Sequence, residues 1–127
     1  MSQRPRVFVT RRLPGRGVED LTQLAEVEVW PGAGSPDPEA LRAGATGADG
    51  LLCLLTDTVD AALLEACPRL RVVSSCSAGV DHIDVAAATA RGIPVGHTPG
   101  VLAETTADLA FALMLDALGA DRRVRPS

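Results

Sequence analysis

The sequence predicts an α/β fold in which a doubly wound, five-stranded parallel sheet carries helices on both faces. Short apolar or β-branched runs alternate along the chain with helix-like segments, a pattern typical of parallel sheets with right-handed crossovers. The run Gly50–Leu55 is apolar without interruption, as expected of a strand buried on both faces. Aspartates stand where helices should begin, at Asp37, Asp60 and Asp84, and aspartate is a favoured N-cap residue.

The first three elements follow from short patterns near the N-terminus. A strand is expected at Arg6–Thr10, which is β-branched, and a turn rich in glycine and proline then leads into a helix over Val18–Ala25. Polar and apolar residues alternate over Glu26–Trp30, which indicates a strand with one solvated face near a sheet edge.

The middle of the chain predicts a helix, a strand and a further helix. Asp37 is the expected N-cap of a short helix with Pro38 in its first turn and Gly44 near its end. After the strand Gly50–Leu55, Asp60 can cap a helix over Ala61–Ala66.

Two more strands complete the sheet. The segment "LRVVSS", Leu70–Ser75, is expected to be a buried strand, and Asp84 to cap a helix over Val85–Ala90 that Gly92 ends. The short strand "IPVG", Ile93–Gly96, carries a proline, which suits a sheet edge. The flavodoxin-like strand order 2-1-3-4-5 places both edge-type strands at the edges.

The last expected helix begins at Thr105 and is unusually apolar. Between Leu109 and Leu118 only Asp116 is polar, and a helix of that kind is buried on most sides. A small sheet covers one side of it, so we expect a partner: another domain, or a second copy in a homodimer formed through Thr105–Leu118. The alternative is that the helix packs deeply within its own domain.

Composition narrows the class of protein. A chain of 127 residues suits one domain, and a net charge of −4 with 2% aromatic residues argues against nucleic acid or an anionic membrane as partner. Three cysteines without a C-x-x-C pair favour a reducing, cytoplasmic location and argue against a metal site. No apolar stretch reaches the roughly 18 residues that would span a membrane.

The stretch "SSCSAGVDHID", from Ser74 to Asp84, follows a buried strand, and ligands of such sheets lie beyond the carboxyl ends of the strands. Ser77, Ala78, Gly79 and Val80 are small, Gly79 can adopt positive φ, and consecutive N–H groups in such a turn form a concavity for an anion. We therefore expect a carboxylate or phosphate site here. The alternative is an ordinary tight turn without a ligand.

Nearby titratable residues have simpler interpretations than catalysis. Asp84 is expected to be a helix cap and Asp81 a turn residue. His82 and His97 are candidate general bases because histidine titrates near neutrality, but a surface or supporting role is preferred for both. The pair Arg11-Arg12 follows the first strand, where a solvated pair is favoured over an anion site.

Several segments together resemble the D-isomer-specific 2-hydroxyacid dehydrogenases, most closely their glyoxylate/hydroxypyruvate reductase branch. The segments "GVDHID", "RGIPV" and "TPGVLAETTADLA" occur in the family's order. Matching pieces run from Val7 to Leu115, which is nearly the whole chain.

The resemblance implies a two-domain enzyme of which this chain is the first domain. Residues 1–104 would form the flavodoxin-like substrate-binding domain, 105–118 a crossover helix, and 119–127 a charged tail. Backbone amides at Ala78 and Gly79 would hold the substrate carboxylate. The other implied positions are Ser77 and Val80 flanking those amides, Leu55 lining the pocket, and Thr106 approaching the nicotinamide cofactor.

The sequence also departs from the family. It contains no G-x-G-x-x-G segment, so the dinucleotide-binding domain is expected to be absent, with the family's downstream catalytic Arg, Glu and His; His82 and His97 do not match that His. The resemblance implies NAD or NADP and a small 2-oxo or 2-hydroxy acid for the complete enzyme. The chain alone is expected to be inactive and to bind no cofactor tightly. The alternative is a non-catalytic module that binds an anion or a protein and self-associates through its final helix.

Overall fold

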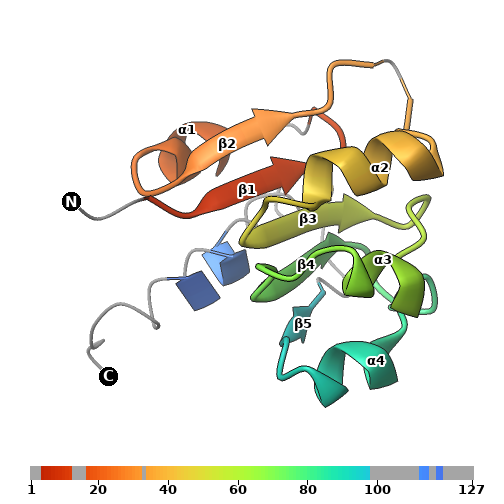
Figure 1. Ribbon diagram of the computed structural model, residues 1–127. Helices are drawn as coiled ribbons and strands as arrows, with labels where there is room; N and C mark the ends of the chain where they lie inside the picture. Colours follow the sequence, from red (N-terminus) through yellow and green to blue (C-terminus); the bar gives the residue numbers. More distant parts are fainter. Residues whose placement is uncertain (1–3, 13–16, 33, 98–111, 115–116, 119–127) are drawn as a thin grey trace.

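The computed structural model describes residues 4–12, 17–32, 34–97, 112–114 and 117–118. Its five-stranded sheet has the order β2-β1-β3-β4-β5, and every neighbouring pair of strands is parallel (Figure 1). This confirms the predicted fold class and strand order. The strands are β1 (Arg6–Val9), β2 (Glu26–Val29), β3 (Gly50–Leu54), β4 (Val72–Cys76) and β5 (Val95–Gly96).

Helices cover both faces of the sheet (Figure 1). One apolar cluster joins α2, α3 and α4 to one face and includes Phe8, Leu51 and Val73. The other includes Leu21 of α1 and Met114, with strand residues such as Leu52. Neighbouring residues of a strand therefore belong to opposite clusters, as a pleated strand requires. The helices are α1 (Gly17–Thr22), α2 (Pro38–Ala45), α3 (Ala61–Glu65) and α4 (Val85–Ala90).

Three of the helices begin at the predicted aspartates. The side chain of Asp37 accepts a hydrogen bond from the N–H of Ala40 at 2.8 Å. Asp60 and Asp84 make the same bond three residues ahead, at 2.9 and 3.0 Å. Each carboxylate satisfies an N–H of the first turn that has no partner within the helix. Gly92 follows the C-cap of α4 and ends that helix, as predicted. Its backbone has a φ of +73°.

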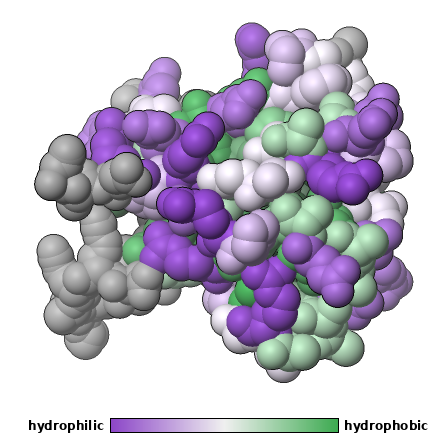
Figure 2. Space-filling model, in the orientation of Figure 1, coloured by the Kyte–Doolittle hydropathy of each residue, from purple (hydrophilic) through white to green (hydrophobic). Residues whose placement is uncertain are grey.

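The edges of the sheet also follow the sequence pattern. In β2 the glutamates are exposed and the valines half-buried, which is the predicted alternation. α1 is shorter than predicted: it ends at Thr22, because the N–H groups of Leu24 and Ala25 both bond to the carbonyl of Leu21 and close a turn. The outer face of the layer formed by α2, α3 and α4 mixes hydrophilic and hydrophobic patches (Figure 2).

The described part of the last helix packs on the sheet of its own chain. Met114 and Leu118 are buried in the same cluster as Val7 and Leu52, whereas Ala112 is exposed. The sheet thus covers one side of this segment. The predicted helix start at Thr105 and the predicted cofactor contact Thr106 lie outside the described residues, and the predicted homodimer stays a prediction. Within the described residues no helix is long and apolar enough to cross a bilayer.

Candidate functional site

The loops that follow the strands are tied together at the carboxyl edge of the sheet. The Thr10 hydroxyl, after β1, donates to Oδ2 of Asp57 at 2.6 Å, and the N–H of Leu54 donates to the same oxygen at 2.8 Å. Asp57 is buried. This carboxylate therefore closes the turn after β3 and fastens it to the end of β1.

A second connection links the loop after β3 to the loop after β4. The N–H of Val59 donates to the carbonyl of His82 at 2.9 Å, and the N–H of Asp84 donates to the carbonyl of Val59 at 2.8 Å. This isolated parallel bridge pairs Val59 with Ile83. The segment between β4 and α4 is consequently anchored at its C-terminal end.

The predicted anion site, Ser77–Val80, forms what we call the cradle loop. Ser77 is buried, Ala78 and Gly79 are exposed, and Val80 is half-buried. The Ser77 hydroxyl donates to the carbonyl of Gly79 at 2.7 Å. Nδ1 of His97, which follows β5, lies 2.9 Å from the carbonyl of Ala78. Both carbonyls at the tip of the loop are therefore held by side chains.

These bonds set the direction of two amide groups. In a trans peptide the C=O and N–H point in opposite directions, and the described residues contain no cis peptide bond. The N–H groups of Gly79 and Val80 consequently point away from His97 and Ser77. Among the described residues neither N–H has a hydrogen-bond acceptor, and the same holds for the N–H of Ala78, the other amide expected at the carboxylate. Adjacent free amides on an exposed loop offer paired donors to an anion.

Gly79 could adopt positive φ because it is a glycine. It does not adopt positive φ; among the described residues Gly92 alone does so. The loop reaches its shape through the hydrogen bonds to Ser77 and His97 and not through a left-handed glycine. The absence of a side chain still matters, because a Cβ built at Gly79 meets no atom within 4 Å. The glycine faces open space, from which a ligand can approach the backbone.

His82 lies against the buried side of the cradle loop. Its Nε2 is 2.8 Å from the hydroxyl of Ser75, which is 2.6 Å from the hydroxyl of Ser77. Burial lowers the pKa of His82 below its ordinary value of 6.5, against the opposing effect of the Asp57 and Asp81 carboxylates. His82 is thus a predominantly neutral ring at pH 7, engaged with a serine. The sequence pattern did not identify Ser75 as part of this chain of bonds.

Buried polar atoms without a partner gather at the same edge. Among the described residues they are Nε of Arg11, Oδ1 of Asp57 and Nδ1 of His82. These residues follow β1, β3 and β4 respectively. Such atoms are rare in folded proteins and call for a specific explanation. Their common position agrees with a functional edge at the carboxyl ends of the strands.

The remaining predicted residues are placed as follows. Leu55 is 62% exposed, a large apolar side chain open to solvent beside this edge. Asp84 caps α4 and Asp81 is exposed. The interpretation of Arg11-Arg12 as a solvated pair is wrong for Arg11, because its guanidinium donates to the Ser35 hydroxyl at 3.2 Å and its Nε is buried.

The cysteines are poorly suited to nucleophilic chemistry. Burial raises the pKa of Cys53 to about 12 and that of Cys76 to about 11. Both side chains are therefore protonated thiols near neutral pH, and the thiolate is the nucleophilic form. Within the described residues no cluster of three or more His, Cys, Asp or Glu side chains could hold a metal ion.

Two cavities lie outside the cradle loop. One of about 410 Å³ lies between α2 and α3, and its lining includes Asp57 and Asp60 against a single cation, Arg42. The excess of carboxylates over cations in this lining disfavours an anionic ligand.

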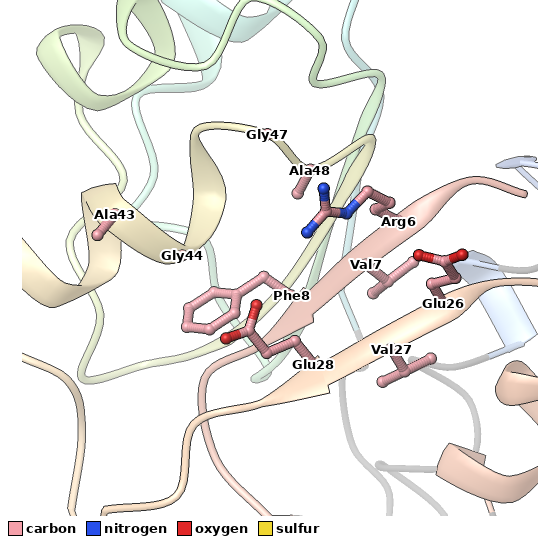
Figure 3. Close-up of a pocket in the computed structure, with 10 residues that line it drawn as sticks. All are labelled: Arg6, Val7, Phe8, Glu26, Val27, Glu28, Ala43, Gly44, Gly47 and Ala48. Carbon is pink, nitrogen blue, oxygen red and sulfur yellow. The ribbon is translucent and has the colours of Figure 1, made fainter. Parts of the chain in front are cut away.

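The other cavity, of about 200 Å³, is at the amino ends of β1 and β2, the opposite edge of the sheet. Figure 3 shows the Phe8 ring beneath Gly44, with Arg6 nearby and Glu28 on the rim. This cavity is separate from the cradle loop and shares no residue with it.

Comparison with known proteins supports the sequence resemblance. Residues 7–118 match the family profile described as D-isomer specific 2-hydroxyacid dehydrogenase, catalytic domain. A glyoxylate reductase of Korarchaeum cryptofilum is 46% identical over 126 residues, which cover 96% of this chain and 38% of that protein. The chain thus spans little more than a third of the length of that curated relative.

Solved structures of proteins with related sequences also resemble this chain. The TT0316 protein of Thermus thermophilus is 40% identical, with a TM-score of 0.72, covering 96% of this chain and 42% of the other. An NADPH-dependent glyoxylate/hydroxypyruvate reductase of Sinorhizobium meliloti, in complex with NADP and malonate, is 32% identical. Its TM-score is 0.60, and the match covers 90% of this chain and 34% of that one.

Proposed function

The chain belongs to the D-isomer-specific 2-hydroxyacid dehydrogenase family, and from this premise we propose that it binds the substrate of an NAD(P)-dependent enzyme. That enzyme interconverts a small 2-oxo acid and the corresponding D-2-hydroxy acid, and this chain supplies the carboxylate site. The observation that carries the proposal is the pair of amides at Ala78 and Gly79, the two positions that the resemblance implies for the carboxylate. Their N–H groups lack acceptors among the described residues, and the carbonyl of Ala78, which shares a peptide group with the Gly79 N–H, is bonded by His97.

The chemistry of the substrate follows from the cradle loop. Two neighbouring N–H groups match the two oxygens of a carboxylate, and they hold the charge without a basic side chain. Leu55, exposed at the same edge, would lie along the short carbon chain of the substrate. The small 2-oxo acids that best fit are glyoxylate and hydroxypyruvate, the substrates in the names of the relatives.

The helix starts of α2, α3 and α4 do not fit the pyrophosphate of a nicotinamide dinucleotide. A pyrophosphate is usually bound at a helix N-terminus that follows a glycine-rich turn. Here the first turns of α2, α3 and α4 are already occupied by the carboxylates of Asp37, Asp60 and Asp84, which repel phosphate. We therefore propose that the cofactor of the complete enzyme is bound mainly by a second domain, which Thr106 approaches at the hinge, and that the described residues of this chain carry out no chemical step themselves.

Within the complete enzyme the role of this domain is binding and orientation. Holding the carboxylate fixes the position of the 2-oxo carbon, and positioning of a reactant contributes substantially to catalysis. We expect the 127-residue chain alone to show no glyoxylate-dependent loss of NADH or NADPH absorbance. A measurable rate with the pure chain would contradict this assignment.

Binding of substrate by the chain can be tested without a cofactor. Glycolate, a two-carbon 2-hydroxy acid, should shift the NMR signals of the Ala78 and Gly79 amides and raise the melting temperature at concentrations above its Kd. Glycolamide has the same size but no charged carboxylate, so it should do neither. If glycolate leaves both amide signals in place at saturating concentration, the proposed function is wrong.

The alternative function is a non-catalytic module that has kept the anion site. That module would also contain the cradle loop, so glycolate binding does not distinguish the two functions. An assay of the full-length protein does, because only the dehydrogenase function predicts glyoxylate-dependent oxidation of NADH or NADPH. Homodimer formation through Thr105–Leu118 is a further proposal, which light scattering at micromolar concentration tests.

A further inference from the structure

The carbonyl of Ala78 is held by a side chain from another part of the chain. Nδ1 of His97, directly after the edge strand β5, lies 2.9 Å from this carbonyl oxygen. β5 pairs with β4 as far as Ser74 and Gly96, so the sheet brings the residue after β5 to the loop after β4. Among the described residues no other group bonds to the Ala78 carbonyl.

The proton of this bond belongs to the histidine. A backbone carbonyl only accepts hydrogen bonds, so Nδ1 of His97 carries a proton where it meets Ala78. The neutral ring with its proton on Nδ1 and the imidazolium both have that proton, so the bond does not depend on the charge of His97. The side chain is exposed, so it can be replaced without opening the core.

This bond fixes one of the two amides that the carboxylate site needs. The Ala78 carbonyl and the Gly79 N–H belong to one peptide group, which is trans, and in a trans peptide the two point in opposite directions. The Gly79 N–H therefore points away from His97. The Ala78 N–H belongs to the preceding peptide group, so the bond from His97 acts on the Gly79 amide alone.

The peptide group between Ala78 and Gly79 is well suited to turning over. Turning it changes ψ of Ala78 and carries φ of Gly79, which is not positive in this structure, to positive values. Glycine adopts positive φ about as readily as negative φ, and both residues are exposed. A turned peptide group would present the Ala78 carbonyl oxygen to the substrate carboxylate, which it repels.

We propose that His97 is a positioning residue that holds the peptide group of Ala78 and Gly79 with its N–H toward the substrate carboxylate. It acts through the backbone and touches no substrate itself. A loop that spends part of its time in a state that cannot bind has a lower apparent affinity, and the bond from His97 stabilises the state that binds. This inference rests on the proposed function, which assigns the carboxylate to the Ala78 and Gly79 amides.

The test compares side chains that differ in where they place a donor. Asparagine places its amide N–H near the position of histidine Nδ1, and glutamine places it near that of Nε2. His97→Asn should therefore retain glycolate affinity, while His97→Gln and His97→Leu should weaken it roughly three- to tenfold. Affinity is measured from the shifts of the Ala78 and Gly79 amide signals in the 127-residue chain. The melting temperature should change little in all three variants, because His97 is exposed.

The orientation of the peptide group has a readout of its own. The distance between the Hα of Ala78 and the amide proton of Gly79 depends on ψ of Ala78. The nuclear Overhauser effect between these two protons, measured without glycolate, should therefore change in His97→Leu and be restored in His97→Asn. Ser35→Ala is the control and should change neither this signal nor the affinity. It removes a hydroxyl at the same edge, in bonds to Arg11 and Thr56 and not to the cradle loop.

The outcomes separate this inference from the proposed function. If the parent chain binds glycolate and the three His97 variants bind it equally well, the positioning role is wrong and the proposed function stands. The positioning role is also wrong if His97→Leu weakens binding while the Overhauser signal stays as in the parent chain, or if His97→Asn binds as weakly as His97→Leu. If the parent chain does not bind glycolate, both the inference and the proposed function are overturned.

Discussion

The Thr10 hydroxyl donates a 2.6 Å hydrogen bond to the buried carboxylate of Asp57. This bond joins the end of β1 to the turn after β3, residues that are 47 positions apart in the chain. The same carboxylate oxygen accepts the N–H of Leu54, so Asp57 organises the turn that presents Leu55. A buried carboxylate at the functional edge thus has a structural role that sequence spacing alone does not reveal.

Replacing Asp57 should cost more stability than replacing Thr10. Asp57→Ala leaves both the Thr10 hydroxyl and the Leu54 N–H without an acceptor, so we expect a loss of about 3 kcal/mol in the free energy of unfolding. Thr10→Val removes one donor with little change of shape, and should cost about 1 kcal/mol. Urea denaturation measures both. Equal losses would show that the second bond, to Leu54, contributes nothing.

Gly79→Ala should separate binding from stability. A Cβ at Gly79 meets no atom within 4 Å and the backbone there does not have positive φ, so the melting temperature should change little. The added methyl group nevertheless occupies the open space in front of the amides, and glycolate affinity should fall about tenfold or more.

Gly34→Ala is the matched control for Gly79→Ala, because a Cβ at Gly34 also meets nothing within 4 Å. Gly34 lies outside the cradle loop, so this variant should keep both stability and affinity. Unchanged glycolate binding in Gly79→Ala would mean that the substrate does not approach from that side.

The fold was predictable because its signals are local. Asp37, Asp60 and Asp84 mark helix starts, and the alternating and continuous apolar runs distinguish edge strands from central strands. The strand order then follows from the rules of parallel sheets. The boundary of α1 was missed because the bonds of Leu24 and Ala25 to Leu21 close a turn where the apolar pattern still continues.

The candidate site was only partly predictable. Backbone donors in the cradle loop could be expected from small residues after a buried strand. The partners of its carbonyls could not, because Ser77 to Gly79 is local but His97 to Ala78 spans 19 residues and needs the sheet register. The backbone conformation of Gly79 was not predictable either: glycine allows positive φ, but Gly79 does not adopt it.

Asp84 should matter for stability and not for binding. Its side chain accepts the N–H of Ala87 at 3.0 Å as the cap of α4. Asp84→Ala should lower the free energy of unfolding by about 1 kcal/mol, whereas Asp84→Ser should retain most of it, since serine is also a good cap. Glycolate affinity, measured by NMR, should be unchanged in both. A large loss of affinity with an intact melting temperature would show that Asp84 takes part in binding.

Met114 should be a core residue of this chain on its own. It is fully buried in the cluster with Val7, Leu52 and Leu118, so Met114→Ala should lower the free energy of unfolding by about 2–5 kcal/mol. Ala112→Ser, at an exposed position of the same helical segment, is the control and should change stability by less than about 0.5 kcal/mol. A neutral Met114→Ala would indicate that this segment does not pack on the sheet in solution.

His82 should make stability depend on pH just below neutrality. Burial lowers its pKa in the folded chain below 6.5, so the unfolded chain takes up a proton first as the pH falls. The contribution of His82 is therefore fully present above its ordinary pKa and is lost as the pH falls from 6.5 towards the lower folded value. His82→Gln keeps a donor near the Nε2 position but does not titrate, so its melting temperature should fall less over this interval. The two proteins differ only at position 82, so the difference between their melting curves reports the effect of the His82 side chain. Parallel curves for the parent chain and His82→Gln would mean that His82 titrates as freely in the folded protein as in the unfolded chain.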